Sequence, residues 1–251
     1  MRGWIGALAL LCAGSPAVAQ EPARCAVPEY LVLAEQPLPR VAAAAQARQL
    51  NIAVIGSGST LLSGSDGASA AYPARLEAAL GRRLPSLAVK VTPFAKGRQT
   101  AQDMVKGFPQ IMADLKPDLV VWQTGTVDAI RGVEPDQFRI VLERGIRIVQ
   151  RARADVILMN MQYSPRTDML IALGPYAVTM RVVAQQMGVP LFDRLSLMRR
   201  WSEDGQFDLY AAHRDTGLAK RVHDCLGKAV AAMIASSGAF QGVTPLAPRV
   251  Q

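Results

Sequence analysis

Residues 51–60 read NIAVIGSGST, and this stretch decides the fold class. A short apolar run without charge, rich in β-branched residues, is typical of a strand buried on both faces of a parallel sheet. The glycine–serine segment that follows it predicts a loop beyond the strand's carboxyl end, where open α/β sheets bind their ligands.

Four more apolar runs of this kind follow, interrupted by charge only at Lys90. They are 87–91, 119–122, 156–159 and 189–192. Apolar stripes at helical spacing lie between and after them, within 72–80, 104–115, 138–149, 176–187 and 218–233. Strands alternating with helices predict a flavodoxin-like three-layer α/β/α sandwich with a five-stranded parallel sheet.

The first nineteen residues resemble a targeting segment. Arg2 is followed by an apolar run at 5–12 and by small residues at 17–19, so we expect a signal peptide at 1–19 that is cleaved before Gln20. The run is too short to span a bilayer, and no later apolar stretch is long enough. The expected location is therefore periplasmic or secreted.

The remaining chain divides into three parts by composition. Residues 20–50 are rich in proline and alanine without a clear period and are interpreted as an N-terminal arm. Residues 51–236 carry the alternating pattern of one α/β domain, and 237–251 are interpreted as a loose C-terminal tail.

Two cysteines follow the predicted cleavage site, Cys25 and Cys225. An even number in an exported chain favours a disulfide between them, with two buried thiols as the alternative. A lipoprotein anchor on Cys12 would need a small residue before it, where Leu11 stands.

The chain is basic, with a net charge of +8 at pH 7. Outside the cytoplasm this balance does not indicate nucleic acid as a partner. It fits a solvated basic face, or contact of the arginine-rich 144–153 helix with an anionic envelope surface. The Arg199-Arg200-Trp201 stretch is likewise interpreted as a solvated face, and the sequence says nothing of oligomeric state.

Several blocks of the sequence resemble those of the SGNH/GDSL hydrolase family, in the family's order. The loop 56–60 resembles the first block, Gly-Asp-Ser-x-Thr, and 122–129 resembles the third, Gly-x-Asn-Asp. Weaker matches are 99–104, 162–165, 188–192 and 215–226. The resemblance covers nearly all of the mature chain and implies an ester hydrolase fold, in which the block-one serine is the nucleophile.

The side chains that would carry this chemistry are replaced. Gly58 stands at the nucleophile position, and Val127 stands at the position of the asparagine that completes the oxyanion hole. Thr216, Gly217 or Leu218 occupies the position of the general base, depending on a one-residue shift. The resemblance therefore implies a degenerate catalytic site, that is, a pseudoenzyme.

A rearranged site is the alternative. Ser59 or Ser57 would be the nucleophile, with His213 as the base and Asp215 or Asp208 to orient it. His223 lies one helical turn beyond the expected base and is interpreted as a helix-surface residue.

The expected cleft carries hydroxyl groups and one carboxylate, which suit a glycan or acyl-glycan better than proton transfer. Its residues are Ser57, Ser59, Thr60, Gly97 (through its backbone N–H), Thr124, Thr126 and Asp128. No cofactor and no metal are expected, since the dinucleotide fingerprint fails at Leu61 and no metal-ligand spacing occurs. A purely structural partner, with a vestigial cleft, is the third hypothesis.

Overall fold

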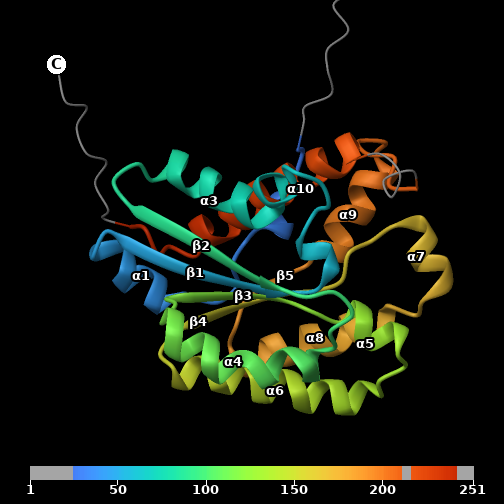
Figure 1. Cartoon of the computed structure of the whole chain (residues 1–251), viewed down its shortest axis with the longest axis horizontal. Coiled ribbons are helices and arrows are strands. Elements are labelled where there is room, and N and C mark those ends of the chain that lie inside the picture. Colours follow the sequence, from blue (N-terminus) through green and yellow to red (C-terminus); the bar gives the residue numbers. More distant parts are fainter. Residues whose placement is uncertain (1–24, 211–215, 242–251) are drawn as a thin grey trace, which may run out of the picture.

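The structure is a computed structural model that describes residues 25–210 and 216–241 (Figure 1). Its centre is a five-stranded, all-parallel sheet in the order β2-β1-β3-β4-β5. The strands are β1 (Gln49–Gly56), β2 (Ala88–Ala95), β3 (Leu119–Gln123), β4 (Asp155–Met159) and β5 (Leu191–Phe192). The flavodoxin-like order confirms the predicted fold class.

Helices cover both faces of the sheet (Figure 1). One face packs against α1 (Pro39–Gln46), α3 (Tyr72–Arg83), α9 (Arg194–Glu203) and α10 (Thr216–Ser236). The other face packs against α4 (Ala101–Leu115), α6 (Pro135–Arg151) and α8 (Gly174–Met187). Short helical segments complete the described chain: η1 (Glu29–Leu31), η2 (Gly58–Thr60), α2 (Gly67–Ala70), α5 (Thr126–Ile130) and α7 (Pro165–Leu170).

Successive residues of each central strand enter different hydrophobic cores. In β1, Ile52 and Val54 belong to the core under α3 and α10, whereas Ala53 and Ile55 belong to the core under α4 and α6. Because side chains alternate between the two faces of a strand, both faces must be apolar when helices cover both. This is the physical reason for the uncharged run that opens the domain.

The predicted N-terminal arm contains a helix that the sequence analysis did not expect. Helix α1 begins with Pro39 at its first turn, where a missing N–H costs nothing, and Val41 and Ala45 are fully buried. Residues 1–24 and 242–251, which hold the predicted signal peptide and most of the predicted tail, lie outside the described residues. Within 237–241, Ala239 is buried in the core.

Helix α9 was also not predicted, and it corrects the interpretation of 199–201 as a solvated face. Trp201 is 1% exposed, and its indole Nε1 donates a hydrogen bond to the Ala26 carbonyl oxygen at 2.8 Å. The arginines before it, Arg199 and Arg200, are partly exposed and pair with Asp168 and Asp204. The helix was not recognised in the sequence because charged residues lie between its apolar positions.

A disulfide joins Cys25 to Cys225, as predicted, and so ties the segment before α1 to α10 across a sequence separation of 200. Helix α10 also approaches α3 closely at Gly227, where a Cβ atom would lie 2.7 Å from the backbone nitrogen of Leu76. Among the described helices, none has the length and apolarity needed to cross a membrane.

Candidate functional site

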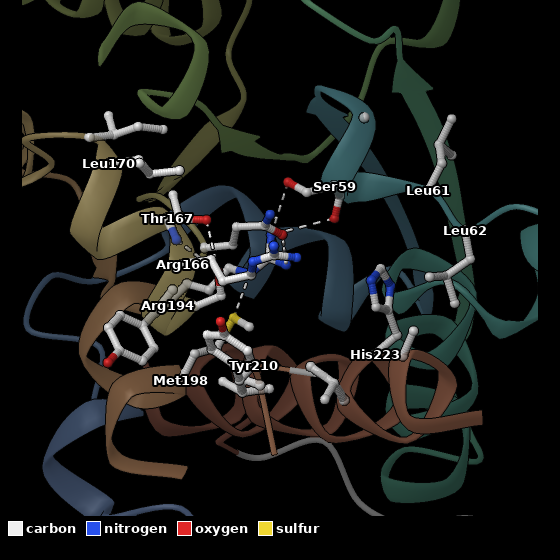
Figure 2. Close-up of a pocket in the computed structure, with 18 residues that line it drawn as sticks. Ser59, Leu61, Leu62, Arg166, Thr167, Leu170, Arg194, Met198, Tyr210 and His223 are labelled. Atoms are coloured by element: carbon white, nitrogen blue, oxygen red, sulfur yellow. Dashed lines mark hydrogen bonds between the residues drawn. The ribbon is translucent and has the colours of Figure 1, made fainter. Parts of the chain in front are cut away.

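A cavity of about 640 Å³ opens at the carboxyl edge of the sheet (Figure 2). Its wall is formed by the loop after β1, by the segment from the end of β4 through α7, and by parts of α9 and α10. A smaller hollow of about 420 Å³ shares Gly58, Ser59 and Gln162 with it and extends toward α5. Because parallel strands bring their carboxyl ends together, segments far apart in sequence meet here.

Gln123, the last residue of β3, fixes the loop after β1. Its amide nitrogen Nε2 donates to Ser59 Oγ at 2.6 Å, and its Oε1 accepts from Thr60 Oγ1 at 3.0 Å. Gln123 and Thr60 are buried, so the hydrogen bond between them is sheltered from water, whereas the bond to Ser59 is partly buried. The sequence analysis missed Gln123, although its place at the end of a predicted strand was a usable signal.

Gly58 is exposed at the start of η2. A Cβ atom there would meet Gly97 Cα at 3.8 Å, which is an ordinary contact, and the backbone of Gly58 is not left-handed. The position could therefore hold a serine. Gly97 itself is exposed beside it.

Three of the predicted cleft residues, Thr60, Thr124 and Asp128, lie inside the protein instead of lining a cavity. Asp128 is 1% exposed, and its carboxylate accepts from the backbone N–H of Ala101 at 3.0 and 3.1 Å and from Thr124 Oγ1 at 3.4 Å. Burial raises the pKa of this carboxyl. Asp128 thus anchors the first turn of α4, a structural task that the sequence analysis did not separate from ligand binding.

The other predicted positions are placed as follows. Ser57, Ser59 and Thr126 line the smaller hollow, together with Val127 at the oxyanion-hole position. Leu218 is buried on α10. His213 and Asp215 lie outside the described residues, and Asp208 is exposed and accepts a hydrogen bond from the backbone N–H of Tyr210 at 3.1 Å.

His223 is buried, and its interpretation as a helix-surface residue is wrong. The side chain is 6% exposed, points from α10 into the cavity, and its Nδ1 accepts from the backbone N–H of Tyr72 at 3.0 Å (Figure 2). Burial, followed by the charge of Arg194, lowers the pKa of His223 to about 3. The imidazole is therefore neutral at pH 7, with its proton on Nε2.

Arg194 is a buried charged residue of the cavity wall that was not predicted from the sequence. It follows β5 almost directly, is 1% exposed, and lines the cavity. Burial lowers its pKa to about 10, so it stays charged at pH 7. Its guanidinium lies over the Tyr72 ring, 5.9 Å from the centroid, and near Ser59. Its position just beyond a predicted strand was the one available signal.

No group of three or more His, Cys, Asp or Glu residues that could hold a metal ion occurs within 25–210 and 216–241. The described residues that line the cavity also include no set of side chains typical of a cofactor site. They are mostly apolar, with some hydroxyl, amide and cationic groups.

Comparisons with known proteins agree on the fold. The chain is similar to TesA (20% identity, 72% of this chain and 97% of that chain, TM-score 0.56). It is also similar to a catalytic mutant of an acetylxylan esterase from Geobacillus stearothermophilus (15%, 72% and 94%, TM-score 0.58). A third similar structure is a two-domain esterase active on acetylated mannans (16%, 82% and 57%, TM-score 0.61).

At these identities the solved structures support the fold alone. No curated protein sequence matches the chain. The family model for the Non-GDSL lipase-like family matches residues 24–239, which is most of the sequence. The chain therefore belongs to the Non-GDSL lipase-like family, within the broader group of SGNH-type hydrolase folds.

Proposed function

We propose that this protein is an exported envelope protein whose degenerate SGNH-type cleft binds an acyl or acylated-glycan ligand without hydrolysing it. The observation that carries the proposal is the environment of Ser59. Its Oγ lies 2.6 Å from the amide nitrogen of Gln123, a group that donates a hydrogen bond and cannot take up a proton.

A serine hydroxyl is a poor nucleophile unless a base accepts its proton. The one histidine in the described chain, His223, accepts a hydrogen bond at Nδ1 from a backbone N–H, and its low pKa makes it a weak base. Val127 offers no side-chain donor to an oxyanion beside the loop. The described part of the site thus supports binding better than acyl transfer.

The cavity has the size of a small-molecule site. Its volume of about 640 Å³ lies within the roughly 300–1,000 Å³ of ordinary ligand pockets. Two structures of similar fold are described as esterases acting on acetylated xylan and acetylated mannans. That likeness supports an acylated glycan as the ligand by analogy of fold. The predicted signal peptide and the disulfide support export.

An active ester hydrolase that uses Ser59 or Ser57 with His213 is the second candidate. Tyr210 and Ala219, which flank 211–215 on either side, line the same cavity as Ser59. His213 lies between these two residues in the sequence, and this is the observation that favours the second candidate.

Ester turnover separates the two candidates. Residues 20–251 would be purified with the disulfide intact and assayed with short-chain nitrophenyl esters and acetylated xylan fragments, beside Ser57→Ala, Ser59→Ala and His213→Ala. If the proposal is correct, the wild-type protein and its three variants will hydrolyse the esters no faster than buffer alone, and the wild-type protein will bind the xylan fragments saturably. Turnover that disappears in Ser59→Ala and in His213→Ala would establish the rearranged active site instead.

A further inference from the structure

Arg194 is a buried cation without a buried anion. It is 1% exposed, and among residues 25–210 and 216–241 no carboxylate lies within ion-pairing distance of it. Its oxygen acceptors are the uncharged Ser59 and Gln162. A charge in such a place costs folding free energy unless a partner compensates it.

The hydrogen bonds that Arg194 makes are weak. Nη1 lies 3.5 Å from both Ser59 O and Ser59 Oγ, and Nη2 lies 3.5 Å from Gln162 Oε1. Ordinary N–H···O bonds measure about 2.7–3.2 Å. Nε is directed to the sulfur of Met198 at 3.3 Å. The two terminal nitrogens thus keep donor capacity that a planar, two-oxygen anion could use.

Neighbouring side chains hold the Arg194 guanidinium in place, although its terminal N–H groups make only long hydrogen bonds. The Tyr72 ring lies beneath it, and the Met198 sulfur lies on the same helix one turn further on. Figure 2 shows the Arg194 side chain in the wall of the cavity, between Ser59 and Met198. A preorganised cation loses little conformational entropy when it binds an anion.

A second donor faces the same space. Because Nδ1 of His223 accepts the Tyr72 N–H, the proton of the neutral ring is on Nε2 and can be donated to a ligand. No aspartate or glutamate of the described chain lines the cavity. An anion there would meet one buried positive charge, that of Arg194, and one neutral donor, without a described carboxylate in the wall to repel it. A second cation, Arg166, also lines the cavity, but it is exposed and lies over the Tyr210 ring.

Most of the remaining wall is apolar, although Ser164, Arg166 and Thr167 also line it. Leucines and other aliphatic side chains from four segments surround the polar centre. They are Leu61, Leu62, Ile171, Met198, Leu209 and Val222. Such a wall matches a hydrocarbon chain, and the single buried charge, that of Arg194, matches a monoanion.

We infer that the cavity binds a free aliphatic carboxylic acid, with the carboxylate on the Arg194 guanidinium and the chain against the aliphatic wall. This inference rests on the proposed binding function and selects, from its two ligand classes, an acyl ligand in the form of a free acid over an acylated glycan. An ester of the same acid is neutral and cannot form the charge-assisted pair. The cleft therefore discriminates in favour of the product of ester hydrolysis over the ester.

The test is isothermal titration at pH 7, where a carboxylic acid is ionised, with octanoate, methyl octanoate, octyl phosphate and an acetylated xylan fragment. Octanoate is expected to bind at least about tenfold more tightly than methyl octanoate, the ratio that one charge-assisted hydrogen bond supplies. Arg194→Met should weaken octanoate binding about 10- to 100-fold and leave methyl octanoate unchanged. Arg200→Met is the matched control, since Arg200 lies on the same helix, is half exposed and pairs with Asp204.

Equal affinities for octanoate and methyl octanoate would overturn the inference, as would tighter binding of octyl phosphate than of octanoate. If Arg194→Met does not fold, the acid-to-ester ratio of the wild-type protein decides alone. Binding of the xylan fragment without binding of octanoate would reject the inference and leave the proposed function standing. Hydrolysis of methyl octanoate would reject the proposed function itself.

Discussion

The pH dependence of stability should reveal the buried, neutral state of His223. The side chain is 6% exposed, and its pKa is lowered from 6.5 to about 3 by burial and by the charge of Arg194. In the unfolded chain the imidazole takes up a proton below pH 6.5, whereas in the folded protein it does so only near pH 3. Stability is therefore complete above pH 6.5 and is lost progressively as the pH falls toward 3.

The magnitude follows from linkage. Each pH unit between the two pKa values costs about 1.4 kcal/mol of unfolding free energy. Between pH 7 and pH 5 the loss due to His223 is about 2 kcal/mol. For an m-value of about 2 kcal/mol/M, the urea midpoint should fall by about 1 M over this range.

The assay is urea unfolding at pH 7 and pH 5, followed by circular dichroism, for the wild-type protein and His223→Asn. The asparagine amide oxygen can replace Nδ1 as acceptor for the Tyr72 N–H but does not titrate. Every other titrating group, including the buried Asp128 and the partly buried Asp155, is common to both proteins. Between pH 7 and pH 5, the unfolding free energy of the variant should fall by about 2 kcal/mol less than that of the wild-type protein. Equal losses in the two proteins would refute the assignment of a depressed pKa to His223.

Three further outcomes are expected. The double variant Cys25→Ser and Cys225→Ser should lower the unfolding free energy by up to about 5 kcal/mol, because the disulfide spans a sequence separation of 200. Urea unfolding measures this change, and an unchanged urea midpoint would exclude a stabilising disulfide. Gly227→Ala should destabilise the protein by about 1–3 kcal/mol, because the added Cβ would meet the backbone of α3. In the same thermal melts, Gly81→Ala should stabilise the protein by about 0.5–1 kcal/mol, because its added Cβ would meet nothing within 4 Å. Equal melting temperatures of the two variants would contradict the close contact between α10 and α3. Gly58→Ser should fold normally and remain unlabelled by a serine-directed phosphonate for lack of a base, so labelling would show that the site holds one.

The sheet could be predicted because its physical cause is local. Charge-free runs such as 52–55 are required wherever helices cover both faces, so the sequence shows them directly. The ends of strands were harder to predict. Strand β2 continues through Pro93 to Ala95 because it lies at the edge of the sheet, where a missing N–H can face away from the ladder.

The site was less predictable because burial of polar groups depends on neighbours distant in sequence. Asp128 and Thr124 carry chemistry that suits a cleft, yet the start of α4 covers them. His223 lies on the face of α10 that meets Tyr72, 151 residues earlier in the chain. Apart from its place just beyond β5, nothing in the local pattern around Arg194 distinguishes it from Arg199 and Arg200, the partly exposed arginines of the same helix.

The disulfide makes the described fold a closed covalent ring. A single backbone cut between residues 25 and 225 leaves one molecule, since both fragments stay joined through sulfur. A protease would therefore have to cut twice within residues 25–225, or act on reduced protein, before any piece of that range could leave. Electrophoresis of nicked samples with and without reductant makes this visible, as one band that becomes two.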